Sequence, residues 1–378
     1  METRRPAEVF HPGEHLLDEL NARGWTQVEF ADILGRPYQL VNEIINGKKG
    51  ITSETARELG AALGTSAEYW MNLNIAYDLW KSNKDVSPIQ HRAKMRTKYP
   101  IRDMALRNWL QPSEDTRIVE SQLLRFFEVE SLDEQPKYAQ TAMPRRSDLD
   151  MDELTPTQIA WLYRVKHIAE AMQVPKYSEK SLREALEQLN AYRAAREEIR
   201  HIPQLLEACG VRFVIVEPLP SSKIDGVCLW LEDSSPVIGL TLRYDRIDNF
   251  WFVLRHEIEH VLNGDGKGSA ILDSDLIGTL EDKDLAPQEQ AANAATVEFC
   301  VPQKELDHFI ARKNPYFSRK DVLNFAKSLE VHPGMVVGQL QWRIKRFDLF
   351  RSMLVTTREM ITHVAMTDGY GNVIPIQI

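Results

Sequence analysis

The sequence predicts a mainly α chain with an α+β carboxy-terminal part: an amino-terminal helix-turn-helix bundle, a helical linker region and a domain with a small antiparallel sheet. Three observations support this fold class. Short apolar-periodic segments separated by glycines fill residues 1–80. Three largely apolar runs that are typical of strands lie between residues 211 and 242. A long apolar segment with helical periodicity, which begins at Phe250, follows them.

Length, charge and cysteine content limit the possible functions. A chain of 378 residues is long for one core, so we expect two or three domains. The formal net charge of -9 argues against a general polyanion binder and confines nucleic-acid contact to a local surface. The first residues lack the apolar part of a signal peptide, and no later stretch suits a membrane span. The 3 cysteines show no CxxC spacing, which indicates a reducing compartment, so we expect a cytoplasmic protein without membrane contact.

Residues 1–80 predict a compact helical bundle of their own. Gly24 and Gly35 suit the left-handed residue that ends a helix, and Thr26 is a side-chain cap for the helix between them. Pro37 suits the first turn of the next helix. The expected helices are 13–23, 26–34, 37–47, 53–63 and 66–80. The apolar side chains expected to be buried, at least in part, are Leu16, Leu17, Leu20, Val28, Phe30, Ala31, Ile33, Leu34, Leu40, Val41, Ile44 and Ile45.

Two short helices joined by a glycine-containing turn form a helix-turn-helix, and the matching segments here are Thr26–Ala31 and Val41–Lys49. They resemble the Cro/C1-type helix-turn-helix family, in particular the HigA-type antitoxins. The resemblance implies a homodimer on double-stranded operator DNA, with the start of the third helix in the major groove. The residues implied at base edges are Tyr38, Gln39 and Asn42, and those implied near phosphates are Gln27, Lys48 and Lys49. Because residues 1–80 are acidic on balance, a protein-docking module is the alternative.

The next region, residues 81–200, is expected to be helical and carries no chemical motif. Its first part concentrates basic side chains, which either add phosphate contacts or belong to a solvated linker helix. These are Lys81, Lys84, Arg92, Lys94, Arg96, Lys98, Arg102 and Arg107. An acidic hinge is expected at 148–154, and Thr155 before Pro156 predicts the N-cap of the helix that follows.

A further domain, residues 201–345, begins with runs that predict strands. Short turns between them predict an antiparallel sheet packed on helices, whose edge would accept an extended peptide by β-addition. Residues 346–378 form a carboxy-terminal extension, in which alternating apolar residues predict a terminal hairpin at 361–378. The expected strands of the domain are 211–217, 226–231 and 237–242.

The apolar segment carries an HExxH pattern, in which His256 and His260 flank Glu257. On a helix, residues four apart share a face, so the two histidines converge on one metal ion, and Zn²⁺ is the expected ion. Glu257 lies beside the open position as general base, where zinc lowers the pKa of water to about 7. Manganese or iron suits the same ligands. The alternative is an amphipathic helix whose histidines are merely hydrogen-bonded.

A zinc hydrolase of this type needs a third protein ligand downstream. A polar stretch at 263–284 is followed by a helical run at 288–300, which stops at Pro302. Glu289 opens this helix, where a carboxylate suits the positive end of the helix dipole. Spacing alone leaves other donors open, namely Asp265, Asp273, Asp275, Glu298 and Cys300.

The two helices together resemble the ImmA/IrrE family of zinc-dependent metallopeptidases over residues 200–345. The second helix keeps Glu289 and Asn293 in the register of that family. The resemblance implies a zincin-like fold with the third zinc ligand at Glu289. Ala295 and Thr296 replace the family's usual Phe-Ala pair, which affects packing more than chemistry.

A DNA reader joined to a peptidase-like domain predicts one of two functions. In the families resembled, such chains are stress-responsive regulators that cleave or inactivate a transcriptional repressor, which predicts a regulatory zinc metalloendopeptidase with a protein substrate. The alternative is an autorepressing HigA-type antitoxin whose carboxy-terminal domain binds a partner, such as a toxin, without cleaving it. His332 is expected to be a structural residue of a turn rather than an electrophile.

Overall fold

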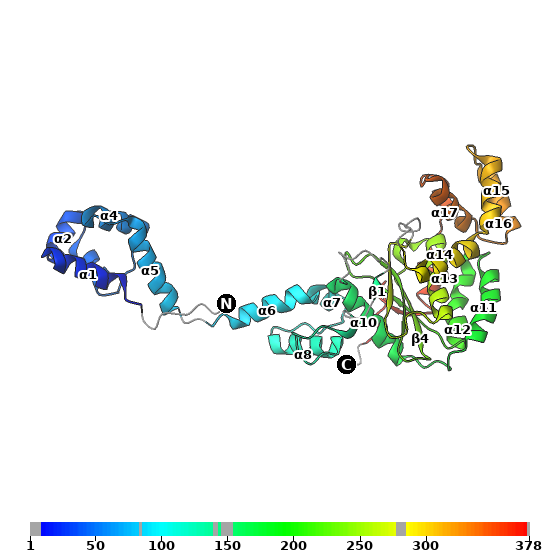
Figure 1. The fold of residues 1–378 in the computed structure, drawn as a ribbon, viewed down its shortest axis with the longest axis horizontal. Coiled ribbons are helices and arrows are strands. Elements are labelled where there is room, and N and C mark those ends of the chain that lie inside the picture. Colours follow the sequence, from blue (N-terminus) through cyan, green and yellow to red (C-terminus); the bar gives the residue numbers. More distant parts are fainter. Residues whose placement is uncertain (1–8, 83–84, 139–142, 145–153, 277–284, 376–378) are drawn as a thin grey trace. The chain divides into compact units, whose positions relative to one another are not determined.

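The computed structural model describes residues 9–82, 85–138, 143–144, 154–276 and 285–375. The chain folds as two compact units, Met1–Gln90 and His91–Ile378 (Figure 1). Lys84 and nearly all of the acidic hinge at 148–154 lie outside the described residues. Within those ranges, no helix combines the length and the apolar character that a membrane crossing requires.

The amino-terminal unit is a bundle of short helices whose ends are set by local caps. Thr26 Oγ1 accepts a hydrogen bond from the Glu29 N–H, and Glu29 accepts one from the Thr26 N–H at 2.7 Å. Gly24 and Gly35 adopt the left-handed conformation that ends each helix before them. The caps place the helices close to the predicted bounds. They are α1 (Pro12–Arg23), α2 (Gln27–Leu34), α3 (Tyr38–Ile45), α4 (Ser53–Leu63) and α5 (Ala67–Lys81).

Packing in this unit corrects part of the expected core. Leu17, Val28 and Ile33 are exposed, although periodicity predicted that they are at least partly buried. The short helix α2 packs mainly on α3 and α4, so the face with Phe30 and Ala31 is covered while the opposite face meets solvent. The buried core consists of Leu16, Leu20, Phe30, Ala31, Val41, Ile44, Ile51, Ala56, Leu59, Leu63 and Trp70.

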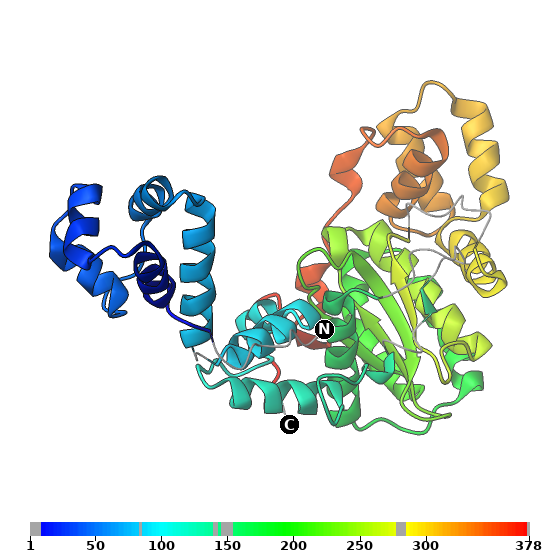
Figure 2. The same ribbon diagram turned by 60° about the vertical axis from the view of Figure 1, so that its left-hand side comes forward.

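The second unit is built around a sheet with helices beside it (Figure 2). The sheet has six strands in the order β1-β5-β3-β4-β2-β6. The pairs β3–β4 and β3–β5 are antiparallel, whereas β1–β5, β2–β4 and β2–β6 are parallel. The sheet is therefore mixed, and the predicted antiparallel arrangement holds only for the pairs that β3 forms. Strand direction alternates from β2 to β4 as expected, but β4 returns between β2 and β3 and becomes a parallel neighbour of β2. The strands are β1 (Met143–Pro144), β2 (Arg212–Val216), β3 (Ile224–Trp230), β4 (Pro236–Leu240), β5 (Ile271–Ser274) and β6 (Met366–Asp368).

Both faces of the sheet are covered, which explains why its central strands are almost entirely buried. Phe213 and Ile215 of β2 belong to one apolar core, and Val214 belongs to the other. The helix α13 (Ile247–Asn263) packs on β3 and β4 within the first core, and α10 (Pro156–Ala171) packs on β2 and β4 within the second. The HExxH helix is thus anchored along a covered sheet.

Other helices surround this sheet, and local signals again set their ends. Thr155 caps α10, as predicted, by accepting a hydrogen bond from the Gln158 N–H at 3.3 Å. The helix α6 (Ser87–Lys98) spans the border between the two units. The remaining α-helices are α7 (Ile101–Leu106), α8 (Thr116–Phe127), α11 (Glu179–Tyr192), α12 (Ile202–Ala208), α14 (Pro287–Cys300), α15 (Gln303–Lys313), α16 (Arg319–Ser328), α17 (Pro333–Ile344) and α18 (Arg358–Ile361).

The carboxy-terminal segment joins the sheet, and within its described part, up to residue 375, the hairpin predicted at 361–378 is reduced to one bridge between Gly369 and Asn372. The strand β6 pairs in parallel with β2. Asp368, which ends β6, accepts hydrogen bonds from Arg164 Nε and Trp109 Nε1, each at 2.7 Å. Arg164 and Asp368 are both buried, so this ion pair connects the tail of the chain to α10.

Candidate metal centre

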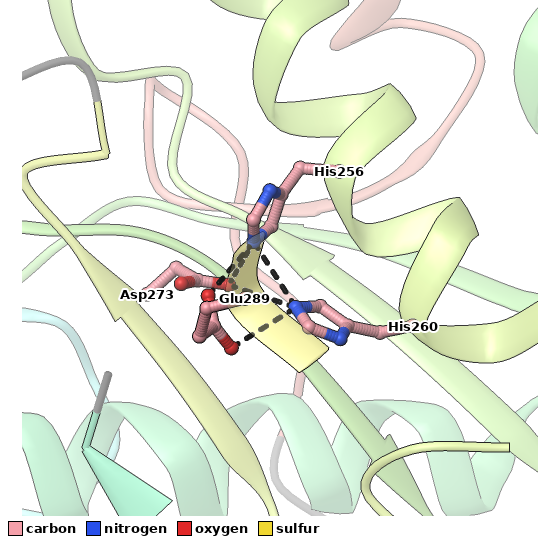
Figure 3. A group of neighbouring side chains, drawn as sticks. All are labelled: His256, His260, Asp273 and Glu289. Atoms are coloured by element: carbon pink, nitrogen blue, oxygen red, sulfur yellow. Dashed lines mark hydrogen bonds and ion pairs between the residues drawn. The ribbon is translucent and has the colours of Figure 1, made fainter. Parts of the chain in front are cut away.

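The HExxH sequence lies on α13, most of which is buried because its apolar side chains fill one of the two cores. The helix ends at Gly264, whose left-handed conformation lets its N–H bond back to the carbonyl group of His260. His256 and His260 lie one turn apart and are fully buried. Both rings point away from the helix axis toward Asp273 and Glu289 (Figure 3).

Four side chains meet at one point. His256 Nε2 and His260 Nε2 are 3.0 Å apart. The two oxygens of Glu289 lie 3.3 Å from these nitrogens, one oxygen beside each. Asp273 Oδ2 lies 3.3 Å from His256 Nε2 and 4.0 Å from His260 Nε2. One donor atom of each residue lies within 4.8 Å of the others, which suits a divalent metal ion.

Glu289, expected as the third ligand, reaches this point from the first turn of α14. Pro287 begins that helix, where its missing N–H costs no hydrogen bond. The helix α14 packs along α13, and its residues Ala292 and Asn293 are buried. Of the residues in the altered family pair, Thr296 is buried and Ala295 is half-buried, so both belong to the packing of α14.

Burial and the contacts within the cluster shift the pKa values of His260 and Glu289 in opposite directions. Burial alone would lower the pKa of His260, but hydrogen bonds to Asp265 and Glu289 and the charges of Asp273 and Glu289 raise that pKa to about 10. Burial and the charge of Asp273 would raise the pKa of Glu289, but hydrogen bonds with His256 and His260 lower it. The carboxylates therefore favour positive charge among them, which fits a bound cation.

Asp265 acts on the cluster through His260. Its Oδ2 lies 3.0 Å from His260 Nδ1, and this contact leaves Nε2 facing the other donors. The remaining residues that the sequence left open as metal ligands lie outside the cluster. Asp275 is exposed and forms an ion pair with Arg243, and Glu298 is exposed. Cys300 is buried in the core, where burial raises the pKa of its thiol to about 12. The role of Asp265 escaped sequence reasoning because its spacing alone does not show which nitrogen it contacts.

Glu257, expected as the general base, is fully buried on α13. It lies against β3 at Gly226, where a Cβ atom would overlap Glu257 Oε1. A glycine at this position therefore lets the strand backbone approach the carboxylate closely. Sequence reasoning missed Gly226, whose signal was a glycine inside a strand pattern.

The expected DNA-contact residues gather on α2 and α3. Asn42 Nδ2 donates to Gln27 Oε1 at 3.1 Å and to the Tyr38 hydroxyl at 3.2 Å, so these side chains form one polar cluster. Tyr38 and Gln39 are exposed at the start of α3. The exposed lysines that follow α3 are Lys48 and Lys49.

His332 and several basic linker residues have structural partners. His332 caps α17, as expected, because its Nδ1 accepts a hydrogen bond from the Gly334 N–H at 3.0 Å.

Lys98 Nζ donates to the carbonyl group of Leu132 at 2.7 Å, and Arg107 forms an ion pair with Glu217. These contacts make Lys98 and Arg107 part of the packing of the second unit.

Comparisons with known proteins identify both parts of the chain. Residues 16–70 match the family model described as helix-turn-helix, and residues 207–340 match the one described as IrrE N-terminal-like domain. These matches confirm the two resemblances and their fusion in one chain.

The helix-turn-helix part has similar relatives. Virulence-associated protein I of Dichelobacter nodosus is 36% identical over 82 residues, which are 21% of this chain and 76% of the relative. Antitoxin HigA-1 of Vibrio cholerae is 40% identical over 78 residues, 20% of this chain and 70% of the relative. Among solved structures, an addiction module antidote protein of a HigA family from Coxiella burnetii is 38% identical in sequence to this chain. The match covers 21% of this chain and 91% of the antidote protein, with a TM-score of 0.20.

Proposed function

Because residues 16–70 belong to the DNA-binding helix-turn-helix family with HigA-like antitoxin relatives, and residues 207–340 to the IrrE N-terminal-like family, we propose that this chain is a regulatory zinc metallopeptidase that binds DNA. Its substrate is a protein such as a transcriptional repressor, and it works in the cytoplasm, where its operator lies. The observation that supports this best is the buried convergence of His256, His260 and Glu289 on one point, with Glu257 on the same helix.

The residues of the cluster divide the work of peptide hydrolysis. His256, His260 and Glu289 would hold the metal, and their donor set suits zinc while also admitting manganese or iron. When bound, the metal supplies a Lewis acid that polarises the scissile carbonyl and activates water. The Glu257 carboxylate takes a proton from the attacking water and donates it to the leaving amine. Asp265 keeps His260 in the orientation that binding requires.

The amino-terminal unit brings the peptidase to double-stranded operator DNA. Gln39 and Asn42 on α3 read base edges, since amide side chains bond adenine in a bidentate manner, and Tyr38 lies beside them. Two chains bind as a homodimer, because helix-turn-helix proteins read half-sites related by a two-fold axis. The phosphate contacts are Gln27, Lys48 and Lys49.

A second function is favoured by the similarity to antitoxin HigA-1. In this case the chain is an autorepressing antitoxin, and its IrrE N-terminal-like domain binds a partner such as a toxin without cleaving it. Operator binding then requires the same residues of α3, but Glu257 has no chemical task.

Metal analysis tests the peptidase function first. After dialysis of the purified full chain against a weak chelator, elemental analysis should find about one zinc per chain. His256→Ala should lose this zinc, whereas Glu298→Gln, on the exposed face of α14, should keep it. If the wild-type chain takes up no metal even when zinc is added back, this result overturns the proposed peptidase function.

The substrate can be sought by comparing protein termini in cells that express the wild-type chain or Glu257→Gln. Mass spectrometry of these termini should find a peptide bond that only the wild-type chain cuts. A metal-loaded chain that binds its operator but creates no new terminus supports the antitoxin.

A further inference from the structure

The cluster contains one donor more than the proposed function needs. Catalytic zinc sites use three protein ligands and leave a position for water, whereas closed sites use four protein donors. Asp273 Oδ2 lies 3.3 Å from His256 Nε2, which equals the distance from Glu289 Oε2 to the same nitrogen. Asp273 is as fully buried as the two histidines. Figure 3 shows its carboxylate directed at the point where the other three side chains meet.

The sheet determines where Asp273 lies. This residue belongs to β5 and pairs with Gly226 of β3 in antiparallel register. On the other side of β5, residues 143–144 pair with residues 271–272 as the strand β1. The strand that presents Asp273 is therefore held on both sides. Its outer edge at residues 271–272 is occupied by this chain itself, so the peptide edge expected from the sequence is covered there.

The charges of the cluster also favour a fourth ligand. Asp273 and Glu289 lie close together in the protein interior, where two like charges repel and each carboxylate loses its hydration. A divalent cation held by both carboxylates and two neutral imidazoles forms a centre without net charge. One ion thereby offsets the free-energy cost of burying the charges of both Asp273 and Glu289.

We propose that Asp273 is a fourth metal ligand, which closes the site and keeps the peptidase latent at rest. This inference rests on the proposed function, since it requires that the cluster binds a metal. Asp273 fills the position that water and the scissile carbonyl need. Cleavage therefore requires that the Asp273 side chain leaves this position, while His256, His260 and Glu289 keep the metal.

Water exchange at the metal tests this inference without measuring cleavage. The full chain is loaded with Mn²⁺, and the relaxation of water protons is measured, because an exchanging water on the ion accelerates it. Because Mn²⁺ prefers six ligands, the wild-type chain leaves room for water on this ion, and Asp273→Asn, which keeps the shape of the side chain, should gain one further exchanging water and weaken Mn²⁺ binding by at least about tenfold. Asp275→Asn, an exposed carboxylate two residues away, should leave both quantities unchanged.

Measurements on the wild-type chain do not depend on whether the variant folds. X-ray absorption of the zinc-loaded wild-type chain should fit four protein donors. A fit to three protein donors and a water oxygen overturns the fourth ligand but leaves the proposed peptidase site intact. A wild-type chain that binds neither Mn²⁺ nor Zn²⁺ overturns both the inference and the proposed function.

Discussion

At the scale of single residues, the proposed function assigns different tasks to Glu257 and to the two histidines on the same helix. We predict that Glu257→Gln keeps the metal and lowers cleavage by about 10²–10⁴-fold, because the amide has the same shape but takes up no proton. Elemental analysis and cleavage of the identified substrate measure the two effects separately. Loss of metal from this variant would make Glu257 a ligand, and unchanged cleavage would remove it from the mechanism. Glu298→Gln is the exposed control.

Asp265 holds His260 from outside the cluster. We predict that Asp265→Ala weakens metal binding by about 10–100-fold, because His260 loses the partner that sets its tautomer and ring orientation. Competition with a coloured chelator measures the affinity, and Asp233→Ala, in the exposed turn between β3 and β4, is the matched control. An unchanged affinity would mean that packing of α13 alone orients His260.

At the scale of elements, α3 presents the side chains expected to read DNA. We predict that Gln39→Ala and Asn42→Ala each weaken operator binding by about 1–3 kcal/mol and relax sequence preference. Lys48→Ala should instead weaken binding to every sequence and reduce its dependence on salt, because it removes a phosphate contact. Fluorescence anisotropy on an operator selected with the wild-type chain measures these effects. An equal loss on selected and random DNA for Gln39→Ala would contradict base reading.

The end of α8 is connected to α10 by Glu128, which forms an ion pair with Lys166 and a hydrogen bond with His167. The hydrogen bond from His167 acts against burial and, together with Lys166, lowers the pKa of Glu128 from 4.5 to about 2. A carboxyl group with a lowered folded pKa stabilises the fold above its unfolded pKa, and this contribution is lost as pH falls from 4.5 toward about 2.

We therefore predict that Glu128→Gln lowers the urea midpoint of unfolding at pH 7, by a modest amount because the carboxylate is 45% exposed. The difference from the wild-type chain should shrink as pH falls from 5 to 3. Urea titrations followed by circular dichroism measure it. A difference that stays constant over this pH range would exclude the ion pair as its cause.

At the scale of the whole molecule, the two compact units should respond differently to metal. A metal that binds only the folded second unit stabilises it by mass action, by about 2.7 kcal/mol at a free concentration of one hundred times Kd. We predict that zinc raises the Tm of this unit and leaves that of Met1–Gln90 unchanged. Calorimetry of the full chain with zinc or chelator measures both transitions. His256→Ala should abolish the shift, and a single transition that moves as a whole would contradict independent units.

Local signals in the sequence determined the amino-terminal bundle and the core of the site. Thr26 and Gly24 set helix ends through bonds to residues a few positions away, so the helices follow from the sequence. His256 and His260 meet because one helical turn separates them. Glu289 required the family resemblance as well, since spacing left several donors open.

The tertiary structure alone decided which segments become neighbours. It placed β4 between β2 and β3, added β6 to the sheet, exposed Val28 and Ile33, and brought Asp273 to the metal cluster. Periodicity shows which face of an element is apolar, but not which distant segment covers that face. The helices and the HExxH pair were therefore determined by the sequence itself, whereas strand order and the fourth donor depend on packing between segments far apart in the chain.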